Sequence, residues 1–104
     1  MTAFRASLAL LLALGAGAAA QAQTAAELNA RALAASCGGC HGTDGRAVPG
    51  EAMVSLAGLA PGHIATQMKA FRDGTRPATV MHQISKGYTP EQIDAIAAYF
   101  ASRK

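Results

Sequence analysis

The chain has 104 residues, with nine Lys or Arg and six Asp or Glu, so its formal net charge is +3. This small positive charge, with no cluster of basic residues and no interleaved aromatic side chains, argues against a nucleic-acid-binding protein. Cys37 and Cys40 are the only cysteines, and a disulfide between them would close a very short loop and add little stability.

Residues 1–22 have the pattern of a secretory signal peptide. Arg5 precedes an apolar run over residues 8–14, and small residues then lead to an A-x-A site at residues 20–22. The apolar run is shorter than the roughly 20 residues that a membrane-spanning helix needs. We therefore predict cleavage after Ala22, export to the periplasm and one folded domain over residues 23–104. Cleavage after Ala20 and a retained membrane anchor are the alternatives.

The predicted domain has 82 residues and a net charge of +2, because Arg5 is removed. A protein core alone gives only marginal stability at this size. The domain has no Trp, and its aromatic residues are Phe71, Tyr88, Tyr99 and Phe100. A large apolar prosthetic group would supply the body that this core lacks.

The first predicted helix leads into the cysteines. Thr24 and Glu27 form the pattern of a capping box, and an Ala-rich run of high helix propensity follows them. The pattern predicts a helix from about residue 25 into Cys37.

Cys37-Gly38-Gly39-Cys40-His41 is, in an exported chain, the attachment signature of c-type haem. One helical turn brings both thiols to the same side, so that each can add to one haem vinyl group. His41 then lies beneath the porphyrin and can bind the iron. The two glycines let the backbone pass close to the ring. We therefore predict one covalently attached haem c.

Loop and helix signals alternate after the motif. Glycines and prolines between residues 42 and 58 predict a long loop. Pro61 begins a helix that ends near Gly74, and Met68 lies on its apolar stripe. A short helix is predicted over residues 79–86.

The last helix has the clearest start signal. Thr89 and Gln92 form a second capping box around Pro90. The apolar face that follows consists of Ile93, Ile96, Ala97 and Phe100. No stretch alternates as a strand, so we predict an all-α fold with helices at both ends.

Two other uses of the cysteines compete with haem. A thioredoxin-like CxxC needs a βαβ context, which the sequence does not indicate. A structural zinc site needs four ligands, and Cys37, Cys40 and two of His41, His63 and His82 are the candidates. Zinc does not explain why His41 directly follows Cys40, because adjacent residues rarely reach one tetrahedral ion together.

The chain resembles the class I c-type cytochromes over nearly all of residues 23–104. Residues 37–42 carry the attachment motif, residues 55–58 are similar to the family's P-x-L-x-G turn, and residues 87–93 and 96–100 are similar to its last helix. Residues 67–81 and 84–88 most resemble the cytochrome subunit of flavocytochrome c sulfide dehydrogenase. The resemblance implies a small cytochrome c fold with helices packed around one haem.

The resemblance also implies that a downstream Met is the second axial ligand. Met68 is expected in the core, and Met53 follows the motif too closely to reach the opposite haem face. Met81 precedes the last helix and matches the ligand position of the family. A bis-histidine site through His82 is the alternative, and otherwise His82 is solvent-exposed or faces a propionate. His63 is expected at the surface.

The surroundings of the haem follow from the same resemblance. In the family, the imidazole of the ligating His donates to the carbonyl of the Pro in P-x-L-x-G, and Val54 stands at that position here. Leu56 and Leu59 are expected to pack on the ring. Arg76 and Lys86 are candidates for pairing with a propionate or for a docking surface, although isolated surface charges more often do neither.

The ligand pair predicts the function. His41 and Met81 together fill both axial positions and raise the reduction potential, which favours electron transfer without catalysis. We therefore expect a periplasmic electron carrier that accepts electrons from a flavoprotein sulfide dehydrogenase, as its subunit or partner. A free diffusible carrier and a haem-based ligand-binding sensor are the alternatives.

Overall fold

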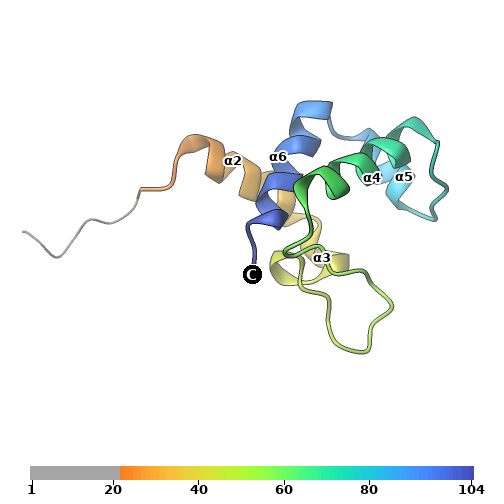
Figure 1. Ribbon diagram of the computed structural model, residues 1–104, viewed down its shortest axis with the longest axis horizontal. Coiled ribbons are helices and arrows are strands. Elements are labelled where there is room, and N and C mark those ends of the chain that lie inside the picture. The colour runs from red at the N-terminus through yellow and green to blue at the C-terminus, as the bar shows by residue number, and fades with distance from the viewer. Residues whose placement is uncertain (1–21) are drawn as a thin grey trace, which may run out of the picture.

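The computed structural model describes residues 22–104, so the predicted signal peptide lies outside the described residues except for Ala22. The described chain forms, in order, α2 (Ala25–Ala35), α3 (Gly38–His41), the 3-10 helix η1 (Thr43–Gly45), α4 (Pro61–Asp73), α5 (Met81–Lys86) and α6 (Pro90–Ala101), as drawn in Figure 1. There is no strand in this part of the chain, which agrees with the predicted all-α class. None of its helices is long and apolar enough to cross a membrane.

Two capping boxes fix where the terminal helices begin, as predicted. At α2, the Glu27 amide donates to Thr24 Oγ1 at 3.2 Å, and the Thr24 amide donates to the Glu27 carboxylate at 2.7 Å. At α6, the Gln92 amide donates to Thr89 Oγ1 at 3.2 Å, and the Thr89 amide donates to the Gln92 side chain at 2.9 Å. Each box satisfies backbone donors that have no partner within the helix.

The first helix is shorter than predicted, because α2 ends at Ala35 rather than in Cys37. The Cys37 amide donates to the Ala34 carbonyl at 3.1 Å, three residues back, and the chain turns before α3 begins. Gly38 and Gly39 are then the first two residues of α3. The cysteine motif therefore has a helical turn of its own.

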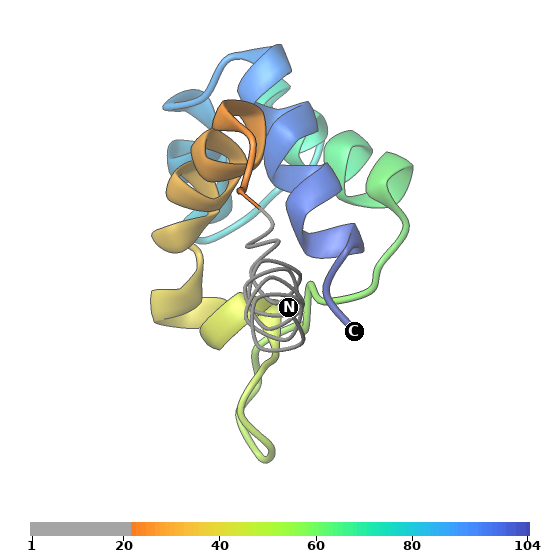
Figure 2. The same ribbon diagram turned by 90° about the vertical axis from the view of Figure 1, so that its left-hand side faces the viewer.

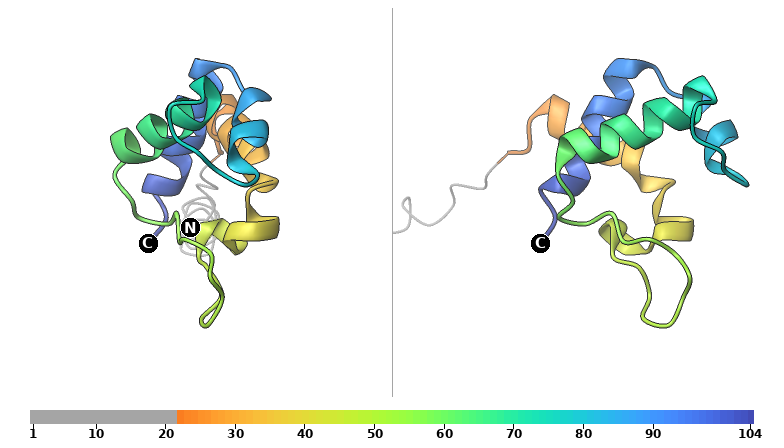
Figure 3. Two further views of the ribbon diagram at one scale, coloured as in Figure 1. Left: turned by 90° about the vertical axis from the view of Figure 1, so that its right-hand side faces the viewer. Right: turned by 45° about the vertical axis from the view of Figure 1, so that its right-hand side comes forward.

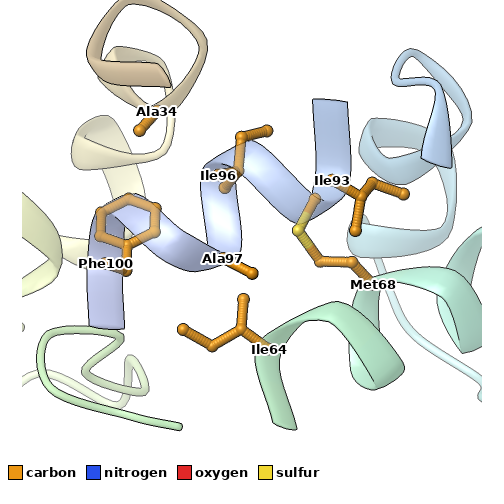
Figure 4. Packing of buried hydrophobic residues seen from close by; sticks show 7 residues of the cluster. All are labelled: Ala34, Ile64, Met68, Ile93, Ile96, Ala97 and Phe100. Carbon is orange, nitrogen blue, oxygen red and sulfur yellow. The ribbon is translucent and has the colours of Figure 1, made fainter. Parts of the chain in front are cut away.

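Helix α6 is the centre of the packing. Helices α2 and α4 both contact α6, and α5 packs against α4. Figure 2 shows α2 and α6 side by side. The buried hydrophobic residues gather along α6 (Figure 4) and are Ala34, Ile64, Met68, Ile93, Ile96, Ala97 and Phe100. Met68 is 7% exposed in this cluster, as expected for a core residue.

The segment between α3 and α4 folds back on itself and onto α6. The carbonyl of Gly45 accepts from the amides of Leu56 and Ala57 at 2.7 and 3.0 Å, and the Gly58 amide donates to the Phe100 carbonyl at 2.9 Å. Ser55 Oγ donates to the same Gly45 carbonyl at 2.9 Å. Between these anchors the chain projects away from the helices as a loop (Figure 3).

Gly45 lies where this segment meets α6. Its φ is +76°, and a Cβ atom there would be 2.6 Å from Cδ1 of Phe100. The position therefore needs glycine for its backbone conformation and also for the space that Phe100 occupies.

We expect Gly45→Ala to destabilise the protein more than Gly50→Ala. Gly50 has a similar φ of +87° but no atom within 4 Å of its would-be Cβ. Gly50→Ala should cost about 1–2 kcal/mol from backbone strain. Gly45→Ala should cost about 1–3 kcal/mol more, because Phe100 must move. Denaturant unfolding of both haem-loaded variants measures the difference, and equal losses would contradict the packing role of Gly45.

Candidate functional site

His41 is held by a hydrogen bond to a residue that is distant in sequence. Its Nδ1 lies 2.7 Å from the Val54 carbonyl oxygen. Because a carbonyl only accepts, Nδ1 carries the proton and donates, which leaves the Nε2 lone pair free for a metal. This is the contact that the resemblance implies for residue 54, even though Val replaces Pro there. The side chain of Val54 is not involved and is 65% exposed.

A sharp reversal after α3 makes this contact possible. Gly42 has a φ of +86° and ends the helix immediately after His41. A Cβ atom on Gly42 would lie 1.8 Å from the Arg46 carbonyl oxygen, so only glycine fits. The reversal sends the chain out and back, so that Val54 returns beside the imidazole.

Cys37 and Cys40 bracket one helical turn and differ in exposure. The Cys40 amide donates to the Cys37 carbonyl at 3.3 Å, and both thiols are free. Cys37 is half-buried against the core, and this burial raises the pKa of its thiol, whereas Cys40 is exposed. A cavity of about 350 Å³ beside the turn is lined by Gly38, Gly39, Cys40, Gly42, Val48, Glu51 and Met53.

The three described methionines have different environments. Met68 is part of the core, and Met53 is 46% exposed on the projecting loop. Met81 is half-buried at the start of α5 and is not part of the core cluster. Met81 is therefore the described methionine that is neither committed to the core nor largely exposed to solvent.

Leu56 and Leu59 are partly buried and pack against the core cluster. The turn that carries them also carries the carbonyl that binds His41. The structure therefore places both leucines against the core.

The residues of the site fit a large apolar group such as haem. Only seven hydrophobic residues are buried in the described chain. Six large apolar side chains remain exposed there, and they are Leu28, Val48, Met53, Val54, Val80 and Ile84. The carbonyl of Val54 contacts His41. Val80 directly precedes the helix of Met81, and Ile84 belongs to that helix. A body that covers such side chains would enlarge the hydrophobic stabilisation of a small core.

The other candidate histidines have separate positions. His63 is exposed near the start of α4, as expected. His82 is half-buried, and its Nδ1 is covered by protein atoms without a hydrogen-bond partner. The His82 side chain as a whole is partly exposed.

Arg76 and Lys86 are both exposed. The guanidinium of Arg76 stacks over the Phe71 ring at 4.6 Å and donates to the Gln67 side chain. Lys86 is in the last turn of α5, where a cation is favourable to the helix dipole.

The structure does not support the competing uses of the cysteines. Across residues 22–104, no three His, Cys, Asp or Glu side chains are grouped so that they could hold a metal ion. The same residues contain no strand, so the βαβ context of a thioredoxin-like motif is missing there.

One polar cluster near the motif was not predicted. The hydroxyl of Tyr99 donates to the Asp44 carboxylate at 2.6 Å, although the residues are 55 positions apart. Arg46 lies 3.7 Å from the same carboxylate, and Arg103 stacks over the Tyr99 ring at 4.4 Å. The Tyr99 hydrogen bond, together with nearby arginines, lowers the pKa of Asp44, and the same hydrogen bond raises the pKa of Tyr99.

Comparison with known proteins identifies similar sequences. Residues 26–104 match the cytochrome c family. The chain is 44% identical over 70 residues to the cytochrome subunit of sulfide dehydrogenase from Chlorobaculum tepidum, covering 67% of this chain and 62% of the relative. It is 35% identical over 72 residues to cytochrome c-554(548) from Halomonas halodenitrificans, and the match covers 66% of this chain and 86% of the relative. The chain thus spans less than two thirds of the sulfide dehydrogenase subunit.

Solved structures show a similar fold. Thiosulfate dehydrogenase from Marichromatium purpuratum superposes with a TM-score of 0.66 at 34% identity, over 75% of this chain and 19% of that chain. Cytochrome c4 from Acidithiobacillus ferrooxidans superposes with a TM-score of 0.65 at 32% identity. The match covers 80% of this chain and 52% of that chain.

We expect the Tyr99→Phe variant to lose less stability in acid than the wild-type protein does. The hydrogen bond holds the folded-state pKa of Asp44 below its ordinary value of 3.8, so its stabilisation is complete above that value and is lost as the pH falls through the folded-state pKa. The free energy of unfolding, measured from pH 7 downward, should therefore fall less steeply below about pH 4 in Tyr99→Phe. Tyr88→Phe is the control, because Tyr88 pairs with Ser36 at 3.0 Å and with no carboxylate. Identical slopes for Tyr99→Phe and the wild type would contradict the assignment.

Proposed function

Because the chain belongs to the class I c-type cytochromes, which carry covalently attached haem c and transfer electrons, we propose that it is a periplasmic carrier of single electrons with His41 and Met81 as axial ligands. The observation that carries this proposal is the 2.7 Å contact between His41 Nδ1 and the Val54 carbonyl. It sets the tautomer in which Nε2 is free to bind iron. The bound haem supplies a reversible one-electron change at its iron.

The residues of the chain have distinct parts in this function. Cys37 and Cys40, at either end of one helical turn, would hold the haem through thioether bonds. The carbonyl of Val54 orients the imidazole of His41 and increases its basicity. Leu56 and Leu59 keep water from the site. A closed, apolar site with two fixed ligands needs little rearrangement when the charge of the iron changes.

Met81 is the favoured sixth ligand for two reasons. Its thioether lies outside the core cluster, whereas Met68 is committed to that cluster. Met81 also precedes the last helix, which is the position of the Met ligand in the family that the chain resembles. A bound thioether of Met81 would favour the reduced iron and so raise the reduction potential. Filled axial positions also favour electron transfer over a gas-binding sensor.

The partner that we propose is a flavoprotein that oxidises sulfide. Support comes from the 44% identity to the cytochrome subunit of sulfide dehydrogenase. In this arrangement the partner performs the catalysis, and the present chain accepts its electrons and passes them on. Residues 1–22 act as the signal peptide, and residues 23–104 form the cytochrome domain.

Met81→Ala should lower the reduction potential by on the order of 100 mV or more and let external ligands such as imidazole bind the iron. The Met-to-iron absorption band should disappear as well. Redox titration and visible spectroscopy measure these effects. Met53→Ala is the matched control, because Met53 is exposed on the projecting loop, and it should change neither property. An unchanged potential in Met81→Ala would refute the ligand assignment.

Purification from the periplasmic fraction should yield a haem protein whose N-terminus is Gln23, bound to a flavin-containing chain on a sizing column. Mass spectrometry identifies the N-terminus, and flavin absorbance identifies the partner. A haem protein that elutes alone would favour a free diffusible carrier. Retention of residues 1–22 would contradict the proposed cleavage.

A further inference from the structure

Helix α5, which carries Met81, contributes little to the hydrophobic core. Among the described residues, the buried hydrophobic cluster contains no side chain of α5, and the buried residue of this helix is the polar Ser85. Ile84 of α5 is 38% exposed, and Val80, directly before the helix, is 54% exposed. Burial of its own apolar side chains therefore holds α5 only weakly, so the position of Met81 depends on other contacts as well.

Tyr88 follows α5 and is joined to it by backbone hydrogen bonds. The Gly87 amide donates to the Ile84 carbonyl at 3.1 Å, and the Tyr88 amide donates to the Ser85 carbonyl at 3.3 Å. The intervening Gly87 has right-handed helical backbone angles, with φ of −76° and ψ of −5°. Because the hydrogen-bonded turn continues through Gly87, Tyr88 moves together with the helix of Met81.

The side chain of Tyr88 makes two contacts beyond its own segment. Its ring packs against the core cluster, and within residues 81–88 it is the side chain that does so. Its hydroxyl lies 3.0 Å from Ser36 Oγ, which belongs to the residue that ends α2 and directly precedes Cys37. Figure 2 shows the connection between α5 and α6 beside α2. One hydrogen bond thus joins the segment of Met81 to the segment that carries the attachment motif.

Helix packing connects these two segments only indirectly. Helix α5 packs mainly against α4, α4 packs against α6, and α6 packs against α2. Small displacements at each of these interfaces add up between Met81 and the attachment motif. The hydrogen bond between Ser36 and Tyr88 instead spans the two segments directly, so it restrains the motion that the helix interfaces leave open.

We propose that Tyr88 is a positioning residue for the sixth ligand, and that its hydrogen bond to Ser36 holds α5 so that Met81 stays bound to the iron. This inference rests on the proposed function, in which Met81 is that ligand. The thioether at Cys37 would hold the neighbouring Ser36 in place and so give the Tyr88 hydroxyl a fixed partner. When Met81 leaves the iron by a movement of α5, this hydrogen bond breaks as well, so its free energy opposes the movement.

The first experiment measures how easily an external ligand replaces Met81. Imidazole is titrated into the haem-loaded ferric protein, and the loss of the Met-to-iron absorption band gives its affinity. Tyr88→Phe keeps the ring and removes only the hydroxyl, so it should bind imidazole about two- to tenfold more tightly than the wild type, which is the factor that one hydrogen bond contributes. Ser36→Ala should have the same effect. An unchanged imidazole affinity in Tyr88→Phe would overturn the proposal.

A double variant and a matched control assign the effect to this one hydrogen bond. The double variant Ser36→Ala, Tyr88→Phe should bind imidazole no more tightly than the stronger single variant, because both substitutions remove the same interaction. Effects of the two substitutions that multiply would contradict the proposal. Tyr99→Phe is the matched control, because it removes a tyrosine hydroxyl that bonds Asp44 instead, and it should leave the imidazole affinity unchanged. Equal shifts in Tyr88→Phe and Tyr99→Phe would also contradict the proposal.

Denaturant unfolding of the same haem-loaded samples separates positioning from a general loss of stability. Tyr99→Phe should lose at least as much free energy of unfolding as Tyr88→Phe, because the Tyr99 hydroxyl donates to a carboxylate, yet only Tyr88→Phe should shift the imidazole affinity. A wild-type protein without the Met-to-iron band would refute both the ligand assignment and this proposal. A wild-type protein that has the band, together with an unchanged imidazole affinity in Tyr88→Phe, would refute this proposal alone.

Discussion

The hydrogen bond from His41 to the Val54 carbonyl connects the attachment motif to the rest of the chain. It joins a residue on a four-residue helix to the return limb of a long loop. That limb is itself fixed by the Gly45 and Phe100 carbonyls, and therefore by α6. Without this connection, the motif would be a short turn at the end of α2 with a freely rotating imidazole. The orientation of the proposed iron ligand thus depends on packing more than 50 residues further along the chain.

The small core explains why attachment and folding belong together. Seven buried hydrophobic residues lie along α6, and none of them comes from the segment that returns to His41. The exposed aliphatic side chains near His41 and Met81 are therefore available to the prosthetic group that the family carries. A covalent link keeps that group in place even when the surrounding protein contributes little binding energy.

Local signals predicted the helices well, because their causes lie within a few residues. Both capping boxes and the Pro61 start depend on neighbours in sequence. The predicted end of the first helix was wrong by two residues, because the chain turns at Ser36 and Cys37 and Gly38 begins a separate helix. The contact of His41 with the carbonyl of residue 54 was expected from the resemblance to the family. The contact of Asp44 with Tyr99 was not, because only the tertiary fold brings those two segments together.

The projecting loop narrows to a neck where Ala47 meets Ser55. Ser55 Oγ accepts from the Ala47 amide at 3.2 Å and donates to the Gly45 carbonyl, so one side chain closes the loop at its base. Residues beyond this neck contribute nothing to the described core. Insertions or deletions between Val48 and Met53, which leave Val54 in place, would therefore cost little more than loop-closure entropy. The length of this loop beside Cys40 can therefore change without disturbing the core, and such a change would reshape the surface around the haem site.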